Sequence, residues 1–282
     1  MLVVSVETIV EIATTIFVLS TMFSIGMEMS PDRLLIALRK HRLMARSLLV
    51  NLVAVPVFAY LLVHLVPMET GYVAGVVLIA VAPGAPFGPK FAEISKSGIE
   101  FASGLMAVLG IISVVTIPVS LALFLPGDVT VDPFGIGWMI FGIQLLPLLA
   151  GIGLEYRYSS VANSLYPPVQ RLSDLSFLLL IVLLVAVYSD EMITLVGTGT
   201  PFVSVVIVCV SLLLGYVLGG PDRNTREVLA TTTAARNAAI ALFIATTGFS
   251  DPRVLMVVLA FSFIGVVLSG LLAGIWARQP TR

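Results

Sequence analysis

The sequence predicts an all-α polytopic membrane protein, and three observations lead to this fold class. Hydrophobic residues make up 59% of the 282 residues and charged residues only 11%, whereas a soluble domain carries about 25% charged residues. Apolar runs of about 20 residues, the length that a helix needs to cross the hydrocarbon core, recur from end to end. The connections between these runs are short, so we expect one transmembrane domain over residues 1–282.

The apolar runs predict nine membrane-spanning helices. The first run contains Glu7 and Glu11 and follows no basic segment, so we interpret it as a retained span rather than a cleaved signal peptide. Many of the breaks hold Pro or Gly with Asp or Asn, which is typical of turns. The nine predicted helices cover residues 6–28, 43–66, 72–96, 99–125, 134–155, 171–189, 201–219, 227–248 and 253–277.

Basic residues fall on alternate connections between these spans. Two of the fifteen lie inside spans, and Arg253 alone accompanies the acidic connections. The other twelve are Arg33, Arg39, Lys40, Arg42, Arg46, Lys96, Arg157, Arg171, Arg223, Arg226, Arg278 and Arg282. The acidic connections hold Glu69, Asp128, Asp132, Asp190, Glu191 and Asp251. The positive-inside rule therefore predicts an outside amino terminus and a cytoplasmic carboxyl terminus in a cell inner or plasma membrane.

Lys90 lies inside a span, directly after the stretch Ala82-Pro-Gly-Ala-Pro-Phe-Gly-Pro89. A regular helix cannot continue through three prolines, because proline lacks a backbone donor and clashes with the preceding turn. We expect a half-helix to restart near Pro89, where its dipole and the Lys90 ammonium both favour an anion. Pro86 and Gly88 in the break are further candidate substrate-binding residues. In the alternative interpretation, the prolines only kink a packing helix and Lys90 pairs with Glu93.

Arg236 is the second cation inside a span, in Thr231-Thr-Thr-Ala-Ala-Arg-Asn237. An ionisable side chain at membrane depth costs several kcal/mol, about 3 on insertion scales, so it marks a functional-site hypothesis. The small neighbouring residues allow close helix approach, and Arg236, Asn237 and Thr233 could then bind a carboxylate. In the alternative interpretation, Arg236 satisfies buried carbonyl groups and has a structural role.

The two interrupted spans run in opposite directions, the one with Lys90 from outside to inside and the one with Arg236 from inside to outside. They occupy corresponding places in the halves 1–126 and 127–282. This arrangement is typical of an inverted-repeat transporter, and paired interrupted segments indicate its binding site.

Other residue types exclude several classes of site. Asn51 and Gln144 lie beside prolines in other spans, where an amide is more often a helix-to-helix hydrogen bond than a ligand. The single cysteine, Cys209, excludes an intramolecular disulfide. Neither histidine has partners at metal-ligand spacing, so no metal site is predicted. The net charge of −1 gives no indication of nucleic-acid binding.

Three stretches resemble the bile acid:sodium symporter family: Gly26-Met-Glu-Met29 followed by Pro31, Ala82-Pro-Gly-Ala85, and Arg236-Asn237 in a Thr/Ala-rich helix. Their order and spacing match over nearly the whole chain. The resemblance implies a five-plus-five inverted repeat with core and panel domains, in which two broken helices cross at the substrate and sodium sites. This chain would be a nine-helix variant that begins at the family's second helix.

The chain departs from the family where sodium would bind. The Ser-Asn pair that ligates sodium in coupled members is Gly88-Pro89 here, and further ligand positions fall at Ala102 and Met106. In the second broken helix the family's Glu falls at Thr232 and its Gln at Arg236. The resemblance leaves two amides at ligand positions, Asn51 and Asn237. We therefore predict that the fixed cations replace bound sodium, with Asn51, Glu93 and Thr232 as candidates for ion coupling.

The sequence as a whole predicts a secondary transporter that moves a small organic anion by alternating access. It would be sodium-independent, with proton-coupled symport, uniport and exchange left open; a sodium- or proton-coupled efflux or exchange carrier is the alternative. Sodium is the only cofactor that the resemblance implies, and membrane lipid is the expected surrounding partner. An enzyme is not expected, because no constellation of paired carboxylates or of serine and histidine lies at depth. A channel or a structural membrane protein is a weaker alternative.

Overall fold

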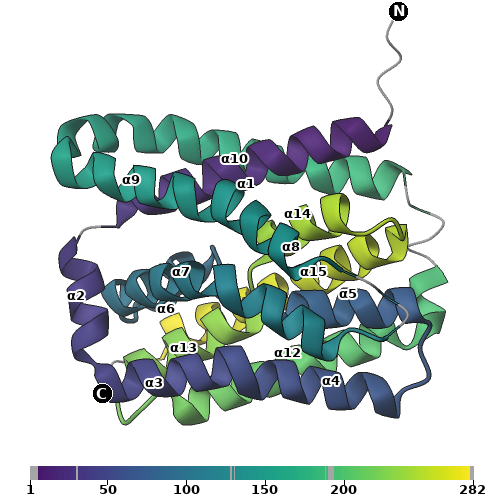
Figure 1. Cartoon of the computed structure of the whole chain (residues 1–282). Coiled ribbons are helices and arrows are strands. Elements are labelled where there is room, and N and C mark those ends of the chain that lie inside the picture. The colour runs from purple at the N-terminus through teal and green to yellow at the C-terminus, as the bar shows by residue number, and fades with distance from the viewer. Residues whose placement is uncertain are drawn as a thin grey trace, which may run out of the picture.

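The computed structural model describes residues 6–29, 31–127, 129, 131–187, 189 and 194–279, and within these ranges the regular structure is helical (Figure 1). Four residues of the predicted charge pattern, Asp128, Asp190, Glu191 and Arg282, lie outside the described residues. The helices of the first half are α1 (Val6–Glu28), α2 (Pro31–Arg39), α3 (His41–Leu49), η1 (Val50–Ala54), α4 (Val55–Leu65), α5 (Thr70–Val81), α6 (Gly88–Ser95) and α7 (Ile99–Phe124). Those of the second half are α8 (Pro133–Ile140), η2 (Phe141–Leu145), α9 (Leu146–Arg157), α10 (Ser159–Val187), η3 (Val196–Thr198), α12 (Thr200–Leu218), α13 (Arg223–Ala235), α14 (Ala238–Gly248) and α15 (Pro252–Ala277).

Seven helical stretches among the described residues are long and apolar enough to cross a membrane. They correspond to seven of the nine predicted spans. The predicted span 72–96 is divided into α5 and α6. α10, which covers most of the predicted span 171–189, is not one of the seven. The chain is therefore a multi-pass helical membrane protein, while the count of nine spans and the inverted repeat remain predictions.

Two segments that the sequence suggested as connections are helical. Residues 31–39 form α2, which buries Ala37 and packs on α7. α10 begins at Ser159 rather than at 171, and its first turns pack against the end of α9. Both segments carry too many polar residues to resemble membrane spans, but an amphipathic helix needs only one apolar face.

The helices form layers in which the two interrupted helices are central (Figure 1). α1, α9 and α10 pack on one another along one side, and we name them the upper layer. α3, α4 and α12 lie along the opposite side. The broken helices α5/α6 and α13/α14 lie between these sides with α7 and α15, and α15 contacts all four of their segments. This arrangement encloses both breaks within protein.

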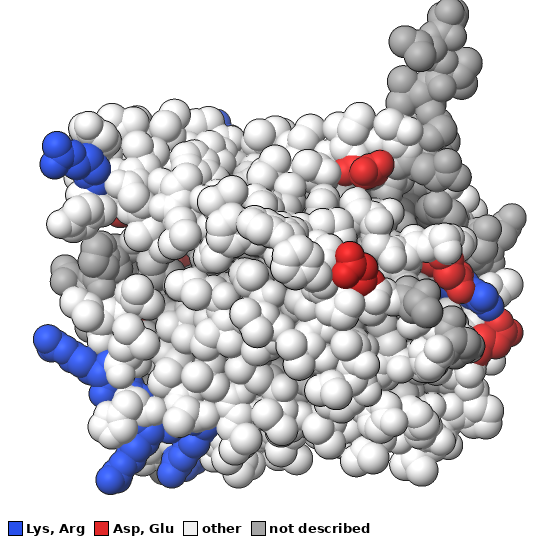
Figure 2. Space-filling model, in the orientation of Figure 1, with Lys and Arg blue, Asp and Glu red and all other residues white. Residues whose placement is uncertain are grey.

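Charged side chains segregate toward the two ends of the helices. Figure 2 shows that, on the face in view, the Lys and Arg side chains lie mainly at the left end and the Asp and Glu side chains mainly at the right. At the acidic end, Arg253 at the start of α15 forms ion pairs with Glu69 and with Asp251, the latter at 2.8 Å, and so links the starts of α5 and α15. This segregation is the pattern on which the predicted orientation in the membrane depends.

Two glycines set the closest approach within the upper layer. A Cβ atom added at Gly26 would lie 2.3 Å from the carbonyl oxygen of Leu148, and one added at Gly151 would lie 2.4 Å from that of Phe23. Backbone atoms cannot give way as a flexible side chain can, so α1 and α9 must separate if either glycine is replaced. Gly26 belongs to the Gly26-Met-Glu-Met29 stretch, and this contact explains its place there.

We expect Gly151→Ala to destabilise the protein by about 1–3 kcal/mol, the usual cost of overpacking. Gly153→Ala in the same helix is the matched control, since a Cβ there meets nothing within 4 Å. Thermal unfolding of the purified variants in detergent compares the two. Equal midpoints for Gly151→Ala and Gly153→Ala would contradict the close packing of α1 and α9.

Candidate functional site

The two broken helices contact each other at their breaks. α6 restarts at Gly88 with Pro89 in its first turn, as predicted, and α13 ends at Ala235 just before Arg236. The amide nitrogen of Asn237 donates a hydrogen bond of 3.0 Å to the carbonyl oxygen of Ala82, which joins the two breaks directly. Nearby, a Cβ atom added at Gly88 would lie 2.3 Å from Thr232 Cγ2, so only glycine allows this approach.

Arg236 is fully buried and is surrounded by neutral oxygen atoms. Its guanidinium donates to Asn51 Oδ1 and to the Asn51 carbonyl oxygen, both at 3.1 Å, and to the carbonyl oxygens of Ile79, at 3.4 Å, and of Ala80. These bonds come from η1 and from the end of α5. They are the contacts expected in the alternative interpretation, in which Arg236 satisfies buried carbonyl groups.

The backbone of Arg236 is itself strained. Its φ of 51° lies in the region that favours glycine, and this is one of two positive φ angles among the described non-glycine residues. Such a conformation costs about 1–3 kcal/mol and persists only where the surroundings hold it. The guanidinium bonds to η1 and α5 supply that restraint, so the break at Arg236 and the position of its side chain depend on each other.

Asn51 lies on a π-helical segment, Val50–Ala54, and contacts both Arg236 and Thr233. Its Nδ2 donates to the carbonyl oxygen of Ser47 at 3.0 Å and to Thr233 Oγ1 at 3.2 Å. Thr232 Oγ1, in contrast, donates back to the carbonyl oxygen of Val228 within its own helix.

Asn237 caps α14 and reaches a second amide on a π-helical segment. Its Oδ1 accepts from the amide of Ile240 at 3.2 Å, and its Nδ2 donates to Gln144 Oε1 at 3.1 Å. Gln144, in Phe141–Leu145, donates in turn to the Gly110 carbonyl oxygen at 2.9 Å and to Ser113 Oγ at 2.6 Å. Each π-helical segment thus directs one buried amide at the crossing, in keeping with the frequent occurrence of such segments at functional sites.

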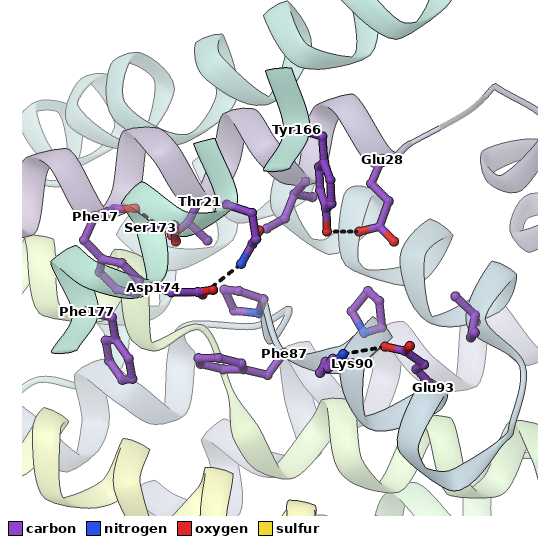
Figure 3. Close-up of a pocket in the computed structure, with 15 residues that line it drawn as sticks. Phe17, Thr21, Glu28, Phe87, Lys90, Glu93, Tyr166, Ser173, Asp174 and Phe177 are labelled. Atoms are coloured by element: carbon purple, nitrogen blue, oxygen red, sulfur yellow. Dashed lines mark hydrogen bonds and ion pairs between the residues drawn. The ribbon is translucent and has the colours of Figure 1, made fainter. Parts of the chain in front are cut away.

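A cavity of about 580 Å³ lies beside this crossing, between the upper layer and the first broken helix (Figure 3). α1 and α10 form one wall, and the segment from Pro86 to Glu93 forms the other. Lys90 lines the cavity with its side chain 65% exposed, and its Nζ lies 2.7 Å from Glu93 Oε2. The ion pair between Lys90 and Glu93 that the alternative interpretation predicts is therefore present. Lys90 also faces the open space of the cavity.

The structure brings together only part of the predicted site. Pro86, Lys90 and Glu93 line the cavity. The predicted site residues that do not line it are Asn51, Gly88, Thr232, Thr233, Arg236 and Asn237. These six are all buried at the crossing. The two cations, which we expected to share one anion, therefore lie in different surroundings, and Arg236 has no face on the cavity.

Sequence reasoning missed the residues that the upper layer contributes. The Tyr166 hydroxyl donates to Glu28 Oε2 at 3.4 Å, and Gln170 Nε2 donates to Asp174 Oδ1 at 2.9 Å, all on the cavity wall. Thr21 and Ser173, which also line the cavity, share a hydrogen bond of 2.6 Å between α1 and α10. The sequence signal that could have indicated this wall was Asp174, a carboxylate inside the predicted span 171–189.

Comparison with a family model and with known proteins indicates one and the same family for this chain. A family model described as the Sodium Bile acid symporter family matches residues 15–215, well over half of the chain. A relative named "Probable sodium/metabolite cotransporter BASS1, chloroplastic", from Arabidopsis thaliana, is 22% identical over 265 residues, which cover 93% of this chain and 66% of the relative.

Two further relatives match over most of the chain. The protein of the same name from Oryza sativa subsp. japonica is 23% identical over 266 residues, which cover 92% of this chain and 64% of the relative. "Probable sodium/metabolite cotransporter BASS5, chloroplastic", from Arabidopsis thaliana, is 23% identical over 245 residues, which cover 83% of this chain and 60% of the relative. The chain thus spans slightly less than two thirds of the length of these relatives. From the match over residues 15–215, the chain belongs to the sodium bile acid symporter family.

Proposed function

We propose that the protein is a secondary carrier for a small organic solute that bears a carboxylate, and that it works by alternating access. The observation that carries this proposal is the cavity of about 580 Å³ beside two broken helices that contact each other at their breaks. Lys90, in the first turn of the restarted helix α6, supplies the cation for the carboxylate, and the amino-terminal end of α6 adds its dipole. A cavity of this size holds a small organic molecule.

The position of the cavity fits one state of an alternating-access cycle. It lies toward the ends of α1 and α6 and the start of α10, which adjoin Lys96 and Arg157. Toward the opposite end, α8 and η2, which lead into α9, are joined to the second broken helix by the bonds from Asn237 to Gln144 and, at 3.7 Å, from Thr247 to Met139. We therefore interpret the conformation as open to the cytoplasmic side, and opening to the other side would require these contacts to break.

We propose further that transport by this chain does not depend on sodium. The relatives are named as sodium/metabolite cotransporters, yet here the guanidinium of Arg236 contacts four oxygen atoms of the kind that bind a hard cation. A permanent internal cation would hold the crossing together without a bound ion. Coupling would then pass through protons at Glu93 or Lys90, or the carrier would work as a uniporter or exchanger.

Uptake into proteoliposomes tests the carrier assignment. The purified protein is first screened by thermal shift against short carboxylates, keto acids, amino acids and bile acids. Compounds that stabilise it are then offered in radiolabelled form. We expect saturable uptake of at least one of them, accelerated by the same unlabelled compound inside the vesicles. A folded, reconstituted protein that accelerates the movement of none of these solutes would overturn the assignment.

A further inference from the structure

The charge balance of the cavity differs from that of a site for a simple anion. Among its described lining residues, Lys90 is the one basic side chain, and it stands against the carboxylates of Glu28, Glu93 and Asp174. Glu93 already offsets Lys90 at 2.7 Å on the wall formed by the broken helix. A solute with only negative charge would therefore face the Asp174 carboxylate as well as Lys90, and like charges repel over a few ångströms.

Asp174 lies next to a cluster of aromatic rings on the same cavity. Phe177 follows it by one helical turn on α10, stacks on Phe17 with ring centroids 5.0 Å apart, and lies 5.8 Å from the ring of Phe87. All three rings line the cavity, and Figure 3 shows the Asp174 carboxylate directed into the space beside them. A carboxylate combined with aromatic faces is the arrangement that binds ammonium groups, methylated ones in particular.

The donor that Asp174 has among the described residues is a neutral amide. Gln170 Nε2 donates to its Oδ1 at 2.9 Å, which orients the carboxylate and leaves its charge uncompensated. On the opposite wall Lys90 is 65% exposed and makes one contact with Glu93, so its ammonium retains donors for a second carboxylate. The cavity thus presents an acidic, aromatic wall on α1 and α10 and a basic group on α6.

We infer that the substrate is a small zwitterion, whose carboxylate meets Lys90 and whose ammonium group meets Asp174 and the aromatic cluster. This inference rests on the proposed carrier function and narrows its substrate from an organic acid to an ammonium carboxylate. Each end of such a solute finds an opposite charge on the wall that it faces, which a dicarboxylate or a keto acid would not.

Pairs of compounds with the same shape isolate the effect of the positive charge on binding. Glycine betaine and 3,3-dimethylbutyrate have the same shape and the same carboxylate, and differ in a quaternary nitrogen against a quaternary carbon. γ-Butyrobetaine and 5,5-dimethylhexanoate form a longer pair of the same kind. Affinities for the purified protein are measured by isothermal titration calorimetry. At least one zwitterion is expected to bind about tenfold more tightly than its carbon isostere, a typical size for a desolvated cation on aromatic rings.

The variant Asp174→Asn separates a charge effect from a general loss of binding. It should remove the preference for the zwitterion and leave the affinity for the carbon isostere equal or higher. Asp222→Asn is the matched control, because that carboxylate is exposed and its side chain caps nothing at the start of α13. It should keep the wild-type preference.

The outcomes are distinguishable from those for the carrier assignment. If the carbon isosteres or other plain anions bind as tightly as the zwitterions, or are taken up in their place, the zwitterion inference is overturned and the carrier function stands. If neither zwitterion binds more tightly than its isostere, or Asp174→Asn leaves their ratio unchanged, the inference is overturned as well. The absence of any accelerated uptake, both in the solute screen and with the two betaines, is the separate result that removes the carrier function.

Discussion

Replacing Arg236 by methionine is expected to destabilise the protein by about 3 kcal/mol or more. The substitution leaves four buried oxygen acceptors, from Asn51, Ile79 and Ala80, without the guanidinium that now bonds to them. Each buried polar group that loses its partner costs about 1–3 kcal/mol, although the break can relax in part. The strained backbone at Arg236 would also lose the bonds that hold it.

Thermal unfolding in detergent, followed by tryptophan fluorescence, measures this loss. Arg157→Met is the matched control, because Arg157 is exposed and contacts only the ring of Tyr158, at 6.0 Å, among the described residues. Arg236→Lys keeps the charge, but an ammonium group cannot bond to as many carbonyl groups as the planar guanidinium does. Its unfolding temperature should therefore fall between those of Arg236→Met and Arg157→Met. If Arg236→Met unfolds at the same temperature as Arg157→Met, the guanidinium does not hold the crossing together.

Gly88→Ala is expected to abolish most transport, and Thr232→Ser is expected to restore it. The new Cβ would lie 2.3 Å from Thr232 Cγ2, at the contact between the two broken helices. Serine lacks that methyl group, and the next atom, Thr232 Cβ, would lie at 3.7 Å, which is an ordinary contact. The double variant should therefore be far more active and more stable than Gly88→Ala alone, which is a strong positive coupling between contacting residues.

The comparison uses initial uptake rates and unfolding midpoints of both single variants and the double variant. Gly274→Ala serves as the control, since a Cβ at that position in α15 meets nothing within 4 Å. The predicted contact between the broken helices is wrong if Gly88→Ala transports normally. It is equally wrong if Thr232→Ser gives no recovery.

The first break was predictable because its cause is local. Three prolines and two glycines between Ala82 and Pro89 exclude a continuous helix whatever surrounds them, and α6 begins where Pro89 allows it. The burial of Arg236 was likewise predictable, because small and apolar residues surround it in the sequence. Its partners were not evident, since Asn51 and Ile79 precede it by 185 and 157 residues.

The other wall of the cavity could not be inferred from local pattern. Tyr166 and Gln170 lie in a polar stretch before the predicted span 171–189, and they become cavity residues because α10 extends back to Ser159 and packs along α1. Glu28 ends the first helix and meets Tyr166 only through this packing. Tertiary contacts of α10 therefore decided which acids share the cavity with Lys90, and the expectation of a plain anion did not take these acids into account.

Sodium dependence of uptake tests most directly the claim that Arg236 acts as a built-in cation. Proteoliposomes containing the protein and a transported solute are assayed in sodium chloride and in potassium chloride, at equal ionic strength and at fixed pH and membrane potential. If the guanidinium replaces the coupling ion, the initial rates will be equal and a sodium gradient will not drive accumulation. Uptake that requires sodium, and that a sodium gradient drives uphill, would contradict this role for Arg236.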